Sequence, residues 1–119
     1  MRSLFTSASL LWLLAAPAGA FAYPDKTVVM VAPFPAGGSV DLVARAVAQQ
    51  MSDLWKQPVV VSNRPGASGN IGAEQVVRAA PDGYTLLMGT TALASSPAVY
   101  PKLGYDVMRD LARCRAGRE

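Results

Sequence analysis

The chain has 119 residues, of which 51% are hydrophobic and 16% are charged, and its formal net charge is +3. The distribution of this charge argues against a basic face that would bind nucleic acid. The surplus comes from Arg2 and from residues 113–119, whereas cations and anions balance between residues 23 and 112. Histidine is absent and Cys114 is the single cysteine, which excludes an internal disulfide, a His-based nucleophilic triad and a zinc site at the usual ligand spacing.

Residues 1–22 have the three-part pattern of a secretory signal peptide. Arg2 provides the positive start, residues 10–16 are apolar, and the Ala-Phe-Ala sequence at 20–22 is typical of a cleavage site. A membrane-spanning helix would need about 20 apolar residues, whereas this run is broken at Pro17. We therefore expect export to the periplasm, cleavage after Ala22, and a mature chain that is not stably inserted in a membrane and forms one small domain.

A buried strand and an amphipathic helix are expected first in the mature chain. Residues 27–32 form a short apolar, β-branched run, and residues 33–39 contain two prolines and a glycine pair that predict a loop. Ser39 is the expected N-cap of the helix. The apolar stripe that we expect to face the core consists of Val40, Val43, Ala44, Val47, Met51 and Leu54.

The same order then repeats. Residues 59–61 predict a second short strand, residues 62–70 are a glycine-rich loop, and residues 71–80 place apolar side chains at helical spacing with Asn70 as the expected cap. A Pro-Asp-Gly sequence ends this helix, and residues 84–88 predict a third strand.

Two oppositely charged pairs are spaced i, i+4 on the predicted helices. Asp41 with Arg45, and Glu74 with Arg78, are expected to form solvated surface ion pairs. Such pairs contribute about 0.2–0.5 kcal/mol each.

The alternation of strands and helices predicts an α/β fold with a parallel sheet and right-handed crossovers. Because the carboxyl ends of parallel strands lie together, the three loops that follow the strands are expected to converge on one rim.

Backbone N–H groups at such a rim suit a negatively charged ligand, since glycine loops and helix N-termini present free donors and the positive end of the helix dipole. The sequence from 66 to 72 reads G-x-x-G-x-x-G, which is neither a dinucleotide fingerprint nor a P-loop, so no cofactor is expected. For each loop alone, glycines that merely permit a tight turn remain an alternative. The candidate ligand-binding residues are Phe34, Ala36, Gly37, Gly38, Ser39, Ser68, Gly69, Asn70, Thr90 and Thr91.

Four sequence blocks, at 23–26, 33–41, 63–73 and 80–87, occur in the correct order and resemble the Bug receptors of tripartite tricarboxylate transporters. The resemblance implies a parallel-sheet lobe of a two-lobed periplasmic binding protein, similar to type II, that closes on a small carboxylate and does not act as an enzyme. It also implies membrane transporter subunits as partners, and a loop at 34–39 that holds the ligand largely through backbone groups and bridging water.

The resemblance covers residues 23–112, roughly the first third of such a receptor, so the second lobe is expected to be missing. Residues 113–119 change abruptly to Arg, Cys, Gly and Ala, which is typical of an out-of-frame tail after truncation. Tight ligand binding is then expected to be lost, because half of the contacts are left to water. The alternatives are a non-functional fragment, a small secreted interaction module and, with less support, a fragment of a doubly wound enzyme.

Overall fold

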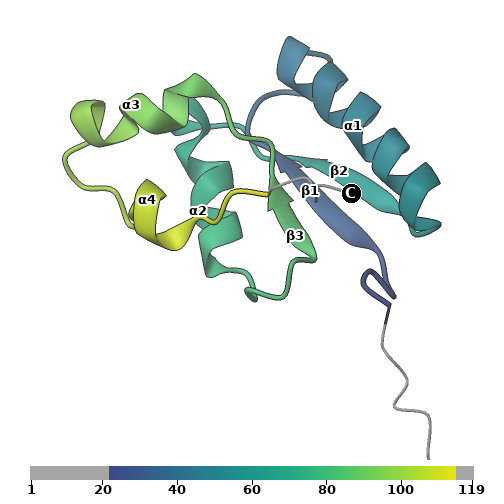
Figure 1. The fold of residues 1–119 in the computed structure, drawn as a ribbon. Coiled ribbons are helices and arrows are strands. Elements are labelled where there is room, and N and C mark those ends of the chain that lie inside the picture. The colour runs from purple at the N-terminus through teal and green to yellow at the C-terminus, as the bar shows by residue number, and fades with distance from the viewer. Residues whose placement is uncertain (1–21, 115–119) are drawn as a thin grey trace, which may run out of the picture.

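The computed structural model describes residues 22–114, and both the expected signal peptide up to residue 21 and residues 115–119 lie outside the described residues (Figure 1). The described part alternates strands with helices, which confirms the predicted α/β class. The elements are β1 (Val28–Ala32), α1 (Ser39–Trp55), β2 (Val59–Asn63), the 3₁₀ turn η1 (Ala67–Gly69), α2 (Asn70–Arg78), β3 (Thr85–Leu87), α3 (Thr91–Val99) and α4 (Val107–Asp110).

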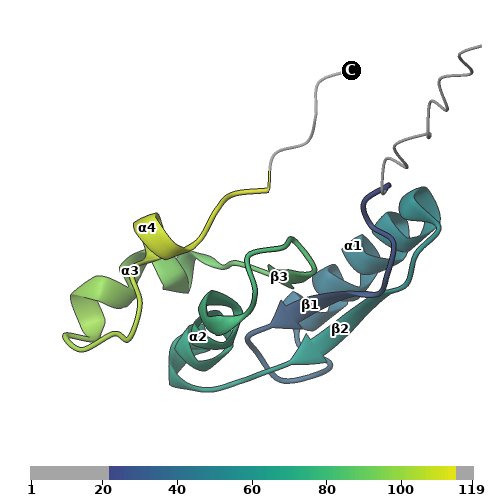
Figure 2. The same ribbon diagram turned by 90° about the horizontal axis from the view of Figure 1, so that it is seen from below.

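The three strands form one parallel sheet in the order β2-β1-β3. Val28 pairs with Val59 at the start of β1, and Ala32 pairs with Asn63 at its end. On the other side of β1, Val29 pairs with Thr85 of β3. Because all three strands run in the same direction, their carboxyl ends share one edge of the sheet, as the sequence predicts (Figures 1 and 2).

Helix α1 covers one face of this sheet (Figures 1 and 2). Met30 and Ala32 of β1 form a buried cluster with Ala44 and Ala48 of α1, and Met51 packs against it. The small alanine side chains allow the helix backbone to approach the sheet closely.

The apolar stripe predicted for α1 is wrong in part. Ala44 is buried as expected, but Val43 is 54% exposed and Leu54 is 79% exposed. The buried face consists of Asp41, Ala44 and Ala48, which are spaced i, i+3, i+7 and therefore also share one side of a helix. Turning the helix to bury its valines would remove both alanines and the Asp41 carboxylate from the sheet.

The opposite face of the sheet is covered by α2, α3 and the segment that leads to α4 (Figure 1). Ala73, Leu93 and Tyr105 form the buried cluster there. The alternation of side chains along β3 places Leu86 against the α1 cluster and Leu87 against this second cluster.

Helices α3 and α4 were not assigned from the sequence. Pro97 lies inside α3, and α4 has a single turn whose N-cap, Asp106, accepts hydrogen bonds from the N–H groups of Met108 and Arg109. Across residues 22–114, none of the helices combines the length and the apolar character needed to cross a bilayer.

Candidate functional site

The three loops beyond the carboxyl ends of the strands lie at the same edge of the sheet. Residues 33–38 follow β1, residues 64–66 follow β2, and residues 88–90 follow β3. The last paired residues of β1 and β2, Ala32 and Asn63, stand opposite each other, so the first two loops leave the sheet from the same level.

The segments that follow the three strands lie close to one another. A Cβ atom added at Gly69 would lie 3.3 Å from Pro33 Cβ and 3.5 Å from Phe34 Cε2, so the second loop packs on the first. Ser39 and Thr90 line one hollow of about 200 Å³, which brings the start of α1 next to the third loop. The structure therefore brings Gly69 into contact with Phe34, and Ser39 to the same hollow as Thr90, at this edge of the sheet, whereas the other predicted residues do not line the hollow.

The predicted site residues differ in how far they reach the solvent. Phe34 and Thr90 are half-buried, and Gly69 and Asn70 are buried. The remaining six are exposed, namely Ala36, Gly37, Gly38, Ser39, Ser68 and Thr91.

Asn70 has a structural role that the sequence did not predict. Helix α2 begins at Asn70 itself, with Gly69 at the N-cap position, so the expected capping role of Asn70 is wrong. The Asn70 side chain donates to the Ala67 carbonyl at 2.7 Å and accepts from the Tyr105 hydroxyl at 2.6 Å. Because η1 leads directly into the helix, this side chain is turned toward the interior and ties α2 to the segment before α4.

Ser39 is not a cap either. Helix α1 begins at Ser39, the N-cap is Gly38, and no side chain caps this end. The Asp41 carboxylate instead accepts the N–H of Gly37, four residues earlier, at 2.8 Å. A carboxylate in the first turn of a helix is favoured by the helix dipole.

Three of the glycine N–H groups expected to face a ligand donate within the protein. Gly37 donates to Asp41 Oδ2, and Gly69 donates to the Gly66 carbonyl at 2.9 Å. Gly38 makes a longer contact of 3.4 Å with the Pro35 carbonyl. These bonds shape the loops. Because the three glycine N–H groups already have acceptors within the protein, they are not available to a ligand.

Donors without a partner are found at the start of α1 and beside it. Among residues 22–114, the N–H groups of Ser39 and Val40 have no hydrogen-bond acceptor, as expected for the first turn of a helix. The hydroxyl oxygen of Thr90 is buried and also has no partner within this part of the chain. Ser39, Val40 and Thr90 all line the hollow of about 200 Å³, whose other walls are Val43, Met88 and Gly89.

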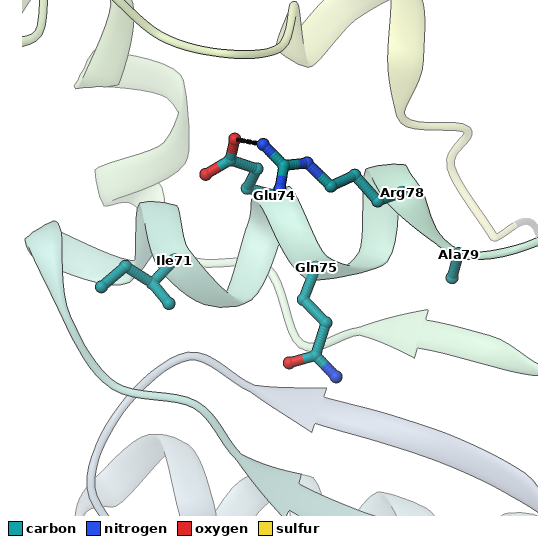
Figure 3. A pocket seen from close by; sticks show the side chains of 5 residues that line it. All are labelled: Ile71, Glu74, Gln75, Arg78 and Ala79. Carbon is teal, nitrogen blue, oxygen red and sulfur yellow. Dashed lines mark hydrogen bonds and ion pairs between the residues drawn. The ribbon is translucent and has the colours of Figure 1, made fainter.

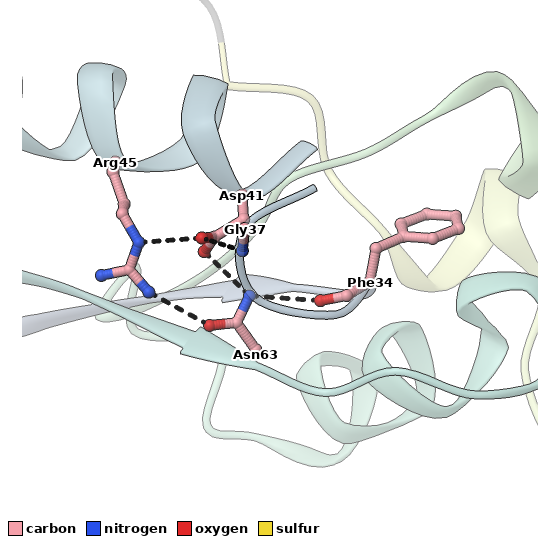
Figure 4. A network of polar contacts seen from close by, with 5 residues as sticks. All are labelled: Phe34, Gly37, Asp41, Arg45 and Asn63. Carbon is pink, nitrogen blue, oxygen red and sulfur yellow. Dashed lines mark hydrogen bonds and ion pairs between the residues drawn. The ribbon is translucent and has the colours of Figure 1, made fainter. Parts of the chain in front are cut away.

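A buried carboxylate next to this rim was missed by sequence reasoning. Asp41, expected to be solvated, is only 2% exposed. It receives hydrogen bonds from the N–H of Gly37, from Arg45 Nε at 3.0 Å and from Asn63 Nδ2 at 2.9 Å (Figure 4). The signal available in the sequence was its i, i+3, i+7 spacing with Ala44 and Ala48, which places Asp41 on the sheet side of α1.

These donors hold Asp41 in its ionised form. The hydrogen bond from Arg45, followed by that from Gly37 N–H, lowers the pKa of Asp41 from 3.8 to about 2. Since the folded-state pKa is the lower one, the resulting stabilisation is fully present above about pH 4 and is lost as the pH falls toward 2.

A second hollow, of about 370 Å³, lies along the outer surface of α2 (Figure 3). Its walls are Ile71, Glu74, Gln75, Arg78 and Ala79, and the predicted Glu74–Arg78 ion pair forms there. No predicted site residue lines this hollow, and its opposed, paired charges offer no donor set for an anion. The rim, rather than this surface, is the candidate site.

The chemistry offered by the rim is that of hydrogen-bond donation to an anion. In the described part of the chain, no group of three Cys, Asp or Glu side chains is arranged to hold a metal ion. Apolar walls from Val40, Val43 and Met88 adjoin the donors, so the hollow has both apolar and donating surfaces.

Comparisons with known proteins agree with this architecture. Residues 43–116 match the family described as tripartite tricarboxylate transporter family receptor. The chain is 44% identical over 100 residues to BugT of Bordetella pertussis, an alignment that covers 82% of this chain and 31% of BugT.

Two solved structures are similar in both fold and sequence. The R. palustris protein Rpa4515 with adipate is 40% identical, with a TM-score of 0.67, and the match covers 71% of this chain and 28% of that one. MatC from Rhodopseudomonas palustris with bound malate is 38% identical, also with a TM-score of 0.67, covering 74% of this chain and 30% of MatC. The chain thus spans about a third of the length of the relatives it matches.

The fold and its loop-built rim are those of a partial lobe of a periplasmic binding protein. More specifically, the chain belongs to the tripartite tricarboxylate transporter receptor family, TctC, to which the resemblance to the Bug receptors points. The matched region ends at residue 116, four residues past the predicted boundary at Ala112, and that boundary stays a prediction.

Proposed function

We propose that this chain carries the amino-terminal ligand-binding lobe of an exported periplasmic receptor. In this proposal the receptor captures small carboxylates without changing them chemically and delivers them to the membrane subunits of a tripartite uptake system. Adipate and malate, the compounds named with two related structures, are both small dicarboxylates. They support this class of ligand.

The observation that carries the proposal is the set of unused donors around the hollow at the start of α1. Ser39 and Val40, whose N–H groups are free, line the same hollow as Thr90, whose hydroxyl is unpaired. An ionised carboxylate accepts several such hydrogen bonds at once, and charge-assisted bonds of this kind are stronger than neutral ones. A hydrocarbon chain attached to the carboxylate would meet the apolar walls formed by Val43 and Met88.

A single lobe offers only part of the contacts that bury a ligand in a two-lobed receptor. A weak complex is therefore expected for the isolated chain, with a Kd of about 1 mM or above, which corresponds to roughly 4 kcal/mol or less.

The proposal is tested by NMR on the ¹⁵N-labelled exported chain, purified from the periplasm of a bacterial host. Adipate and malate are titrated at constant ionic strength, with the neutral diamide of adipic acid as the control. We expect saturable shifts of the amide signals of Ser39, Val40 and Thr91 with the carboxylates only. Equal shifts with the diamide, or none at the rim, would contradict the proposal, and chemical consumption of the carboxylate would indicate an enzyme instead.

A matched pair of variants locates the site. Thr90→Val removes the buried hydroxyl while keeping the side-chain shape, so the carboxylate affinity should fall about fivefold to tenfold, the equivalent of one hydrogen bond. Thr27→Val makes the same change at an exposed residue just before β1, at the opposite edge of the sheet. Its affinity should stay within twofold of the parent chain (~0.4 kcal/mol).

A further inference from the structure

Three side chains beside the rim form a closed ring of hydrogen bonds (Figure 4). Arg45 Nε donates to Asp41 Oδ2 at 3.0 Å, and Arg45 Nη2 donates to Asn63 Oδ1 at 3.3 Å. Asn63 Nδ2 completes the ring by donating to Asp41 Oδ1 at 2.9 Å. The ring links helix α1 to the carboxyl end of β2 and fixes the orientation of both carboxylate oxygens.

The same ring is bonded to the first loop at two points. Asp41 Oδ2 accepts the N–H of Gly37 at 2.8 Å, and Asn63 Nδ2 donates to the Phe34 carbonyl at 3.1 Å. Gly37 has a φ of +82°, a conformation that strongly favours glycine. The two bonds therefore hold the loop at Phe34 and at Gly37, directly before this unusual backbone turn, and so define where the next residues, including Ser39, enter α1.

The charge of Asp41 creates a second requirement. Its carboxylate lies in the first turn of α1, where a bound carboxylate would use the neighbouring N–H groups of Ser39 and Val40. Two like charges that share a helix N-terminus repel each other. Among the described residues, the charged group bonded to Asp41 is Arg45 on the same helix, while β2 and the loop contribute the neutral donors Asn63 and Gly37.

We propose that Asp41 is a positioning residue that holds the loop at 34–38 in its ligand-receiving shape, and that Arg45 neutralises it so that a carboxylate can approach the rim. The inference rests on the proposed function for the identity of the ligand. The positioning role of Asp41 concerns only the shape of the loop, so it can be measured by amide exchange without any ligand.

The positioning role is tested by amide hydrogen exchange in Asp41→Asn. An NH₂ group turned toward Gly37 and Arg45 breaks the Gly37 attachment of the loop. An NH₂ group turned toward Asn63 instead breaks the bond that orients Asn63 Nδ2 toward the Phe34 carbonyl. We expect exchange at Gly37 or at neighbouring loop amides to accelerate about tenfold, the equivalent of one hydrogen bond. Glu74→Gln, in the exposed i, i+4 pair of α2, is the matched control and should leave these rates unchanged.

If Asp41→Asn fails to fold, as judged by loss of the near-ultraviolet signal of Trp55, Asn63→Ala provides the second variant. It keeps the Gly37 bond to Asp41 but removes the Asn63 bonds to the Phe34 carbonyl, to Asp41 and to Arg45, so the loop amides should change while α2 amides do not. Unchanged loop exchange in a folded Asp41→Asn or Asn63→Ala chain would overturn the positioning role.

The neutralising role is tested with Arg45→Gln and its matched control Arg78→Gln, using the adipate titration. Arg45→Gln leaves the Asp41 charge uncompensated, so affinity should fall about threefold to tenfold at ~20 mM salt, and the loss should shrink at ~0.5 M salt through screening. A loss independent of salt, or an equal loss in Arg78→Gln, would overturn this role. If the parent chain shows no carboxylate-dependent shift, the proposed function fails, whereas the Gly37 exchange result still decides the positioning role.

Discussion

At the scale of single residues, Gly72 shows what one missing side chain does for this fold. It lies in the first turn of α2, where the helix passes the end of β1. A Cβ atom at this position would lie 2.9 Å from Pro33 Cβ and 3.1 Å from the Arg64 carbonyl oxygen. Both neighbours belong to loops of the rim, so the close packing of α2 also supports the site.

Gly72→Ala should therefore destabilise the protein. Alanine favours the helix by about 1 kcal/mol, but the contacts with Pro33 and with a backbone carbonyl leave little room to adjust, and overpacking of this kind costs about 1–3 kcal/mol. We expect a net loss in the free energy of unfolding, measured by urea denaturation. Gly89→Ala is the control, since a Cβ there meets only Leu93 Cδ1 at an ordinary 3.6 Å. Equal stability of Gly72→Ala and Gly89→Ala would contradict the packing argument.

The role of a single residue could be predicted from the sequence where it depends on neighbouring residues, but not where it depends on a partner far away in the chain. The sequence placed the candidate residues after the three strands, because each follows a short apolar run; their role in ligand binding stays a prediction. It did not predict which of them donate internally, since the partner of Asn70 is Tyr105, 35 residues away, and the ring through Asp41 of α1 includes Asn63 of β2. Long-range side-chain partners leave no local pattern in a single sequence.

At the scale of elements, the strands and their parallel order could be predicted because short β-branched runs alternate with helical periodicity. The orientation of α1 could not. Two overlapping stripes share this helix, one of large apolar side chains and one of Asp41, Ala44 and Ala48, and apolar periodicity favours the wrong one. The packing of Ala44 and Ala48 against β1 and the hydrogen bonds to Asp41 decide the actual orientation of α1.

This orientation predicts how substitutions on α1 behave. Replacing the exposed Val43, Val47 and Leu54 together with polar residues should change the free energy of unfolding by only about 0.5 kcal/mol per site or less, and should reduce self-association of the apolar surface. Ala48→Leu, on the buried face, should destabilise by about 1–3 kcal/mol through overpacking. Urea denaturation and sedimentation velocity measure the two effects, and a large loss of stability in the triple variant would place the stripe in the core after all.

At the scale of the whole molecule, the fold depends on two small clusters on opposite faces of a three-stranded sheet. Within residues 22–114, β2 and β3 each have one neighbour, β1, so both outer edges of the sheet are unpaired. Small cores of this kind leave little net stability, and 1–2 kcal/mol is then a large fraction of the total. Contacts that join distant parts of the chain consequently have a large effect on the folded fraction.

The hydrogen bond between Tyr105 and Asn70 is such a contact, because it joins the segment before α4 to the start of α2. Tyr105 is 7% exposed and its hydroxyl donates to Asn70 Oδ1 at 2.6 Å. Tyr105→Phe keeps the ring in the second cluster but leaves the Asn70 oxygen buried without its donor, which costs about 1–3 kcal/mol. The free energy of unfolding, followed by Trp55 fluorescence in urea, should fall by that amount. The control, Tyr100→Phe, removes only an exposed contact with Ser68, and its free energy of unfolding should fall by less than about 0.5 kcal/mol. Equal losses of stability in the two variants would show that the bond between Tyr105 and Asn70 does not stabilise the lobe.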